Sequence, residues 1–180
     1  MAQFDEARMP TYDAVARTLH WLVVGLIVAQ FILGWTMPGV HHDTRPIGLI
    51  AWHLAVGGTI ILVMALRIAW RGTHAAPPDT TTAPVLKRVA DATHVLLYAL
   101  LVAVPLLGWA NASSRGWTVR AFGVLQLPGL TPTGSAFGAA MGDIHGDLAW
   151  VLLGLISLHV GAALLHRFVL KDHVLQRMLP

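Results

Sequence analysis

Long apolar runs, separated by short polar connections, dominate this sequence. Four of them are nearly free of charge, at about residues 18–37, 47–70, 89–110 and 144–169. Each run approaches the ~20 residues that cross a hydrocarbon layer about 30 Å thick. The helices of a soluble bundle carry polar stripes at helical spacing, and these runs lack them. The pattern therefore predicts an all-α integral membrane protein, a four-helix bundle that forms one domain over residues 1–180.

Basic residues are distributed unevenly among the connections. Nine of the twelve lie at the two termini or in and around the 71–88 connection, namely Arg8, Arg17, Arg67, Arg71, Lys87, Arg88, Arg167, Lys171 and Arg177. Arg45, Arg115 and Arg120 occupy the other two connections. Because basic residues accumulate on the cytoplasmic side of membrane proteins, both termini and the 71–88 connection are predicted to be cytoplasmic.

Composition narrows the possible chemistry. Charged residues make up 12% of the chain, against roughly 25% in soluble domains. The formal net charge of +3 is too small to suggest a nucleic-acid partner. The chain has no cysteine, which excludes disulfides, thiolate-bound zinc, iron–sulfur clusters and haem attached through a C-x-x-C-H motif. The ten histidines are therefore the main candidate metal ligands.

Most of the histidines lie in or beside apolar segments, where contact with water cannot account for the presence of a polar side chain. Six fall within or at the edge of the apolar runs: His20, His53, His94, His145, His159 and His166. The other four, His41, His42, His74 and His173, lie in connections or in the tail and need no special explanation. An ionisable side chain inside a membrane is costly and is usually functional. One such histidine is commonly hydrogen-bonded to a neighbouring helix, but six in one small bundle point to a bound metal group.

The predicted topology sorts these histidines into two layers. His53 and His145 begin their runs at the outer side, whereas His20 and His94 begin theirs at the inner side. His159 follows His145 by roughly four helical turns, ~21 Å along the axis and ~40° short of the same angular position. The last run therefore presents one imidazole to each layer. Its outer partner is His53, and its candidate inner partners are His20 and His94.

Paired imidazoles without carboxylates or thiolates favour one kind of metal group. Zinc normally takes four ligands and completes them with cysteines or acids, and non-haem iron takes a carboxylate. Haem iron receives four nitrogens from its macrocycle and needs only two axial ligands. Two haem groups, each held by two histidines, would account for four of the histidines. Because both axial positions are then filled, the expected chemistry is one-electron transfer from one side of the membrane to the other.

Several short motifs follow one another along the chain. They are T-L-H-W at His20, Arg45-Pro46 before A-W-H-L at His53, A-T-H-V-L-L-Y at His94, R-G-W and A-F-G in the third connection, I-H-G and L-H-V-G-A-A-L-L-H-R-F in the last run, and K-D-H at 171–173. In this order and spacing, the chain resembles the bacterial cytochrome b561 family over nearly its whole length. The resemblance implies a multi-pass protein of the bacterial inner membrane with two haem b groups. By position, His53 and His145 would hold the outer haem, and His20 and His159 the inner one.

The closest type within that family is similar to superoxide oxidases. This implies that superoxide is oxidised at the periplasmic face and that ubiquinone is reduced near the cytoplasmic face. Arg45, Arg115 and Arg120, with His41 and His42 nearby, can concentrate a small anion at the outer face, although solvation or contact with lipid phosphates explains the arginines equally well. The alternative function is an electron-transfer subunit docked to a soluble dehydrogenase or hydrogenase. The short connections leave little area for docking of such a partner outside residues 111–143. That long connection forms either a lid over the bundle or a spacer.

Quinone is expected at the inner side, where His94, His166 and Lys171 are the candidate residues. Imidazole titrates near neutral pH and suits proton delivery, while a lysine can stabilise a developing anion. Basic residues at the inner ends of membrane spans also reach toward lipid phosphates without any further role. His94 is in addition a rival ligand of the inner haem, and His166, about two turns past His159 on the same face, is a weaker one.

Overall fold

The computed structural model describes residues 11–77 and 84–179. Its four long helices are α1 (Ala14–Thr36), α2 (Leu49–Thr73), α3 (Pro84–Ser114) and α4 (Ala136–Leu165). One π-helical turn, η1 (His166–Leu170), continues α4, and a short hairpin of β1 (Arg120–Ala121) and β2 (Leu125–Gln126) connects α3 to α4. All four long helices have the length and apolar composition needed to cross a membrane. The predicted all-α membrane bundle is therefore confirmed.

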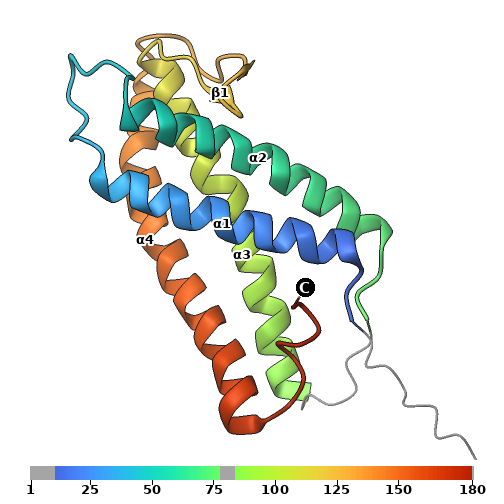
Figure 1. The fold of residues 1–180 in the computed structure, drawn as a ribbon. Coiled ribbons are helices and arrows are strands. Elements are labelled where there is room, and N and C mark those ends of the chain that lie inside the picture. Colours follow the sequence, from blue (N-terminus) through green and yellow to red (C-terminus); the bar gives the residue numbers. More distant parts are fainter. Residues whose placement is uncertain (1–10, 78–83, 180) are drawn as a thin grey trace, which may run out of the picture.

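The helices form two antiparallel pairs. α1 packs along α2, α3 packs along α4, and α2 also packs against α3. Figure 1 shows the two pairs close together at the end that carries the hairpin and diverging toward the other end. Buried side chains hold the pairs together: Val23, Ile60, Val63 and Met64 in one cluster, and Leu97, Val104 and Leu152 in the other. Among the described residues, the backbones of α1 and α4 do not come close to each other, although the rings of Trp35 and Trp150 lie 6.4 Å apart between centroids.

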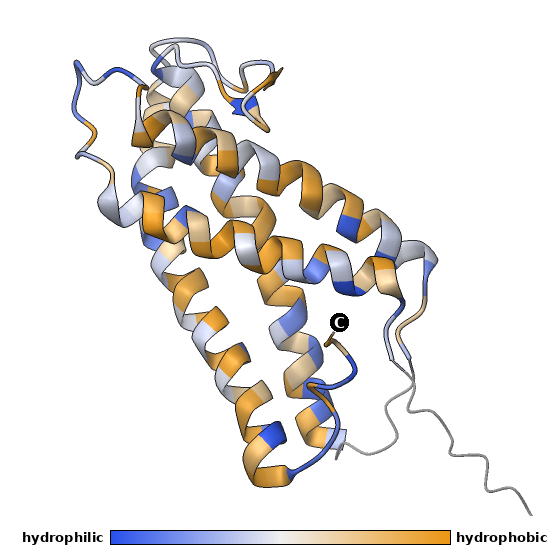
Figure 2. Cartoon of the chain, viewed as in Figure 1, coloured by the Kyte–Doolittle hydropathy of each residue, from blue (hydrophilic) through white to orange (hydrophobic). Residues whose placement is uncertain are grey.

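The outward faces of the helices are apolar. Large exposed hydrophobic side chains occur on every long helix, for example Leu22, Leu66, Leu96 and Leu158. Figure 2 shows hydrophobic residues along the length of the helices and hydrophilic ones mainly in the connections. Such surfaces are stable in contact with lipid, because the helical backbone satisfies its own polar groups.

The start of α1 is fixed by Asp13. Its carboxylate accepts a hydrogen bond from the backbone N–H of Ala16 at 2.8 Å, as in a typical N-cap. The indole N–H of Trp70, near the end of α2, also donates to this carboxylate, at 3.1 Å. These bonds, led by the one from Ala16, lower the pKa of Asp13 below its ordinary value of 3.8. One side chain therefore caps α1 and ties it to α2.

Both ends of the described chain lie on the same side of the bundle. The backbone N–H of Tyr12 donates to the carbonyl of Arg177 at 3.1 Å, and the indole N–H of Trp21 donates to the carbonyl of Met178 at 2.9 Å. The C-terminal segment thus folds back onto the beginning of α1. This is the side that the charge distribution assigns to the cytoplasm, although Arg8 lies outside the described residues.

Candidate functional site

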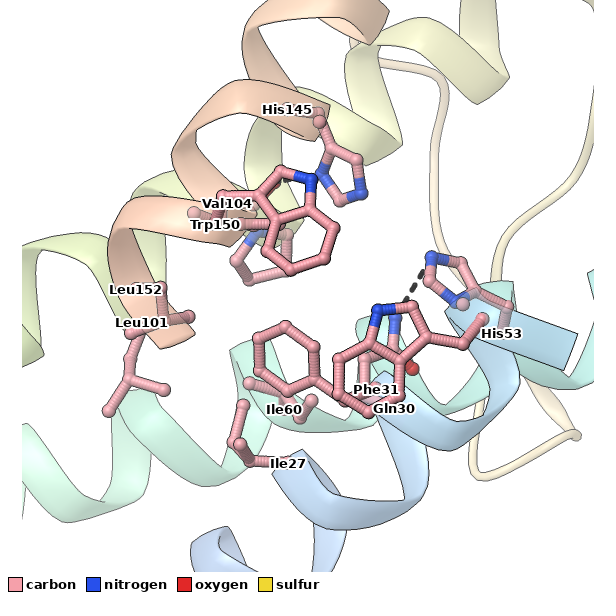
Figure 3. Close-up of a pocket in the computed structure, with 15 residues that line it drawn as sticks. Ile27, Gln30, Phe31, His53, Ile60, Leu101, Val104, His145, Trp150 and Leu152 are labelled. Carbon is pink, nitrogen blue, oxygen red and sulfur yellow. Dashed lines mark hydrogen bonds between the residues drawn. The ribbon is translucent and has the colours of Figure 1, made fainter. Parts of the chain in front are cut away.

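His53 and His145 face each other across a pocket at the outer end of the bundle. His53 comes from α2 and His145 from α4; their ring centroids are 6.0 Å apart and the ring planes are nearly perpendicular, at 86°. The pocket has a volume of about 310 Å³ and is lined by all four long helices. Figure 3 shows the two imidazoles on opposite walls, with mainly apolar side chains around the space between them. The structure thus brings together the predicted outer pair.

His145 is held in one tautomer. Its Nδ1 lies 2.8 Å from the backbone carbonyl of Val104. A carbonyl oxygen only accepts hydrogen bonds, so Nδ1 carries the proton and donates it. The lone pair is then on Nε2, which is the arrangement of histidines that bind metals. The ring also packs closely on Gly108, where an added Cβ would lie 3.0 Å from two of its atoms.

His53 is arranged differently. The side-chain amide nitrogen of Gln30 lies 3.1 Å from Nε2 of His53, so Nε2 accepts this bond and the proton of the neutral ring is on Nδ1. That Nδ1 and the amide oxygen of Gln30 are both buried and have no hydrogen-bond partner among the described residues. Buried polar atoms are nearly always paired. A metal bound through Nε2 would leave both atoms unpaired, so they do not by themselves indicate the bound group.

The donor set fits haem. The pocket offers two neutral imidazoles from facing helices, and its lining includes no carboxylate. In the described parts of the chain, no three His, Asp or Glu side chains gather closely enough to hold a bare metal ion. A metal that brings four ligands of its own needs only this pair. Gly34 lies beside the ring of His53, which is 3.5 Å from the position that a Cβ at this residue would occupy.

A second histidine cluster lies toward the inner side. The rings of His94 on α3 and His159 on α4 are 5.4 Å apart between centroids and inclined at 71°. His20 on α1 lies close enough to interact electrostatically with both. Three of the predicted inner residues therefore gather in one place, but the ring facing His159 most closely is that of His94.

Arg67 of α2 organises this inner cluster. Its Nη2 donates to Nδ1 of His20 at 3.0 Å, and its Nε donates to the hydroxyl of Tyr98 at 2.9 Å. A guanidinium group only donates, so Nδ1 of His20 accepts and the proton of this neutral ring is on Nε2. Ligation of a metal through Nε2 of His20 thus requires Arg67 to release Nδ1.

Sequence analysis missed the roles of Arg67, Tyr98 and Gln30. The signal for Arg67 was present, because a charged residue inside a membrane span is usually functional. It was used only to predict orientation. Tyr98 and Gln30 gave no comparable signal, since each becomes notable only through the residue that it contacts.

The outer arginines do not form one cluster with the histidine pocket. Arg115 donates from Nη1 to the carbonyl of His41 at 3.1 Å, which links it to the turn that leads to the exposed Arg45. Arg120 lines a different pocket of about 570 Å³, together with Pro46, Trp52 and Trp117. The predicted anion-binding residues therefore lie at the same end of the molecule, and none of them lines the histidine pocket.

Of the three residues predicted for quinone, His166 and Lys171 lie together at the end of α4, where the backbone N–H of Lys171 donates to the carbonyl of His166. His94 lies in the inner histidine cluster. Nδ1 of His166, in η1, is paired with the carboxylate of Asp172 at 2.5 Å. Lys171 is exposed and adopts a left-handed conformation with φ of 54°, at the point where η1 ends.

Comparison with known proteins places this arrangement among membrane cytochromes. The family model described as prokaryotic cytochrome b561 matches residues 11–180. The chain is 28% identical over 170 residues to cytochrome b561 homolog 2 of Escherichia coli (strain K12), covering 93% of this chain and 90% of that protein. It is 30% identical over 174 residues to the probable superoxide oxidase CybB of Yersinia pestis, covering 94% and 96%. It is 31% identical over 176 residues to cytochrome b562 of Cereibacter sphaeroides, again covering 94% and 96%.

Proposed function

The chain belongs to the prokaryotic cytochrome b561 family, and on that premise we propose that it is a superoxide:ubiquinone oxidoreductase of the bacterial inner membrane. Membership makes it a multi-pass membrane protein that binds haem b and transfers electrons. The proposal adds that electrons enter at the outer face and leave near the inner face through two haem groups. The observation that carries it is the presence of facing imidazoles in two layers, 6.0 Å apart between ring centroids in the outer layer and 5.4 Å in the inner layer.

His53 and His145 are the proposed ligands of the outer haem. Held by these two imidazoles, the haem would supply one-electron transfer. The carbonyl of Val104 keeps the proton of His145 on Nδ1 and leaves Nε2 for the metal. On the other wall, the amide of Gln30 contacts Nε2 of His53. That amide must turn away before His53 can bind through the same nitrogen.

The inner haem is assigned to His159 and His20 by the family resemblance. His94 is the rival of His20, because its ring lies closest to that of His159. The two candidate ligands differ in their contact with Arg67. This residue donates a hydrogen bond to Nδ1 of His20, and among the hydrogen bonds described it makes none to His94. Whichever of the two binds iron, Arg67 holds a positive charge beside the inner site.

Superoxide as the electron donor is supported by two observations. One relative, 30% identical, is described as a probable superoxide oxidase. In addition, Arg45, Arg115 and Arg120 place three positive charges at the outer end of the molecule, against Asp43 and Asp143 in the same connections, and local positive charge raises the encounter rate with a small anion.

Ubiquinone as the acceptor requires a supply of protons at the inner side, because its reduction takes two electrons and two protons. Nδ1 of His166 lies within hydrogen-bond distance of a carboxylate oxygen of Asp172, and an imidazole paired with a carboxylate suits proton delivery. Lys171 places a cation beside them, and His94 adds a second imidazole within the histidine cluster. These four residues are the proposed inner-side machinery.

The purified protein should reduce a ubiquinone analogue when superoxide is generated enzymatically. Superoxide dismutase should abolish this reaction, which makes it the control for direct reduction by the generating system. If the haem groups respond to dithionite but superoxide produces no quinone reduction, the proposed activity is wrong. A soluble dehydrogenase that co-purifies in fixed proportion and restores electron entry would identify the alternative, an electron-transfer subunit.

A further inference from the structure

The hairpin in the connection between α3 and α4 has a polar base and an apolar tip. At the base, Arg120 of β1 is paired with Gln126 of β2. The tip exposes Phe122, Val124 and Leu125, whose side chains are 58%, 82% and 51% accessible. Three apolar side chains so exposed on a short hairpin are unfavourable in water. These three side chains are therefore expected to lie in an apolar environment.

The hairpin is firmly attached to α2. Ala121 is completely buried, and the backbone N–H of Phe122 donates to the hydroxyl of Thr59 at 2.8 Å. Gly58 permits this close approach, because a Cβ there would lie 3.0 Å from a methyl group of Val119. The tip is thus held in place by α2 rather than free to move away from it.

The attachment point lies on a face of α2 that is adjacent to, and distinct from, the face that lines the histidine pocket. Residues Trp52, Thr59 and Leu66 follow one another at intervals of about two turns, which puts them on one face. Trp52 and Leu66 are 63% and 61% accessible, whereas His53 and Ile60, which line the pocket, lie about 100° further round the helix. Thr59 lies about 10 Å along the helix from Trp52. The hairpin therefore occupies the lipid-facing surface of a membrane-spanning helix, between two residues that are exposed on that same surface.

The backbone of the tip is largely self-satisfied. Besides the bond from Phe122 to Thr59, the N–H groups of Gly123 and Val124 donate to the carbonyls of Arg120 and Ala121, both at 3.1 Å. A non-helical segment is tolerated at membrane depth only when its polar backbone groups find partners within the protein. A loop exposed to water needs no such pairing.

The surroundings of the base match the membrane interface. Arg120 lines a pocket with Trp52 and Trp117, and tryptophan and arginine both favour the level of the lipid headgroups. We propose that the 120–126 hairpin is embedded in the outer leaflet, with its tip among the acyl chains and Arg120 at the headgroup level. The connection 111–143 then acts as a membrane anchor on α2. This inference does not depend on the identity of the electron donor or acceptor.

The absence of cysteine makes a direct test possible. A single cysteine introduced by Val124→Cys can carry a nitroxide spin label, and the labelled holoprotein is reconstituted into phosphatidylcholine–phosphatidylglycerol vesicles. Leu66→Cys serves as a lipid-facing control, and Asp43→Cys, in the first outer connection, as a water-facing control. Collision rates with oxygen, which concentrates in lipid, and with a water-soluble nickel chelate give the environment of each label. An unchanged haem spectrum verifies that each variant is folded.

The label at 124 should resemble that at 66, with high access to oxygen and low access to nickel. High access to nickel, as expected at 43, would overturn the proposal. Low access to both reagents would also overturn it, because it would show that another protein surface, such as a second copy of the chain, covers the tip. In a Thr59→Val background the label at 124 should gain mobility and nickel access, whereas Thr59→Ser should preserve both. No change in Thr59→Val would contradict the attachment to α2.

Discussion

At His145, one hydrogen bond determines which ring nitrogen is available to a metal. The carbonyl of Val104 fixes the proton on Nδ1, and the close packing on Gly108 fixes the ring position. His53 and His20 have no such arrangement, because a donor from Gln30 or Arg67 occupies a nitrogen of each. The imidazoles were predictable from the sequence as candidate ligands, but their tautomers were not, since these depend on neighbours from other helices.

Gly108→Ala should weaken the outer haem site without affecting the inner one. The new Cβ would lie 3.0 Å from two atoms of the His145 ring, and the hydrogen bond to Val104 leaves that ring little freedom to retreat. Loss of such support typically costs about 10-fold or more in affinity for the metal group. Haem titration of the purified variant measures this change. Gly72→Ala is the matched control, because its Cβ would have no neighbour within 4 Å; equal haem affinity in both variants would show that the ring tolerates the crowding.

The apolar runs correctly predicted that these segments are helices and the order in which the helices follow one another, but they did not predict the length of each helix. The run expected at about 89–110 lies within the longer helix α3, Pro84–Ser114, and the run expected at about 144–169 lies within α4 and its continuation η1, Ala136–Leu170. Hydropathy marks the part of a helix inside the hydrocarbon layer, whereas caps such as Ser135, which accepts from the N–H of Gly138, mark where the helix begins. The hairpin at 120–126 was not predicted, because two-residue strands carry no periodic pattern.

The cap of α1 should make the protein sensitive to acid. The pKa of Asp13 is lowered, chiefly by the hydrogen bond from Ala16, so its contribution to stability is complete above its ordinary value of 3.8 and is lost as pH falls through the lower, folded-state pKa. Asp13→Asn keeps an acceptor for Ala16 but does not titrate. The thermal midpoint of the wild type should therefore exceed that of Asp13→Asn at pH 6, and the difference should shrink below about pH 4. A difference that stays constant from pH 6 to 3 would show that the charge of Asp13 is irrelevant to the cap.

The molecule as a whole is polarised along the membrane normal. Histidines are stacked in two layers, at the outer pocket and at the inner cluster, and the ends of the described chain meet at the inner side. The layers could be predicted because helical geometry converts residue number into depth. The identity of the inner pair could not be predicted, since the apolar runs place His20 and His94 at the same level and only packing determines which one faces His159.

Electron uptake from superoxide should depend on the outer arginines. Changing Arg45, Arg115 and Arg120 together to glutamine should lower the second-order rate with superoxide by about 10-fold or more at low ionic strength and should flatten its salt dependence. Stopped-flow reduction of the haem groups measures this rate. The matched control changes Arg71, Lys87 and Arg88 to glutamine, which alters net charge equally on the inner side. Equal effects of the two triple variants would exclude local attraction at the outer face.

Haem content per chain, measured with absorption and low-temperature EPR spectra in ligand variants, tests the two-layer arrangement most directly. The wild type should hold two haem b groups, both low-spin. His53→Ala and His145→Ala should each lose only the outer one, and His159→Ala only the inner one. The resemblance predicts that His20→Ala loses the inner haem signal and that His94→Ala keeps it. If His94→Ala loses this signal and His20→Ala keeps it, the inner ligand is His94. A wild type with a single haem, or a His145→Ala variant that keeps both low-spin signals, would contradict the arrangement itself.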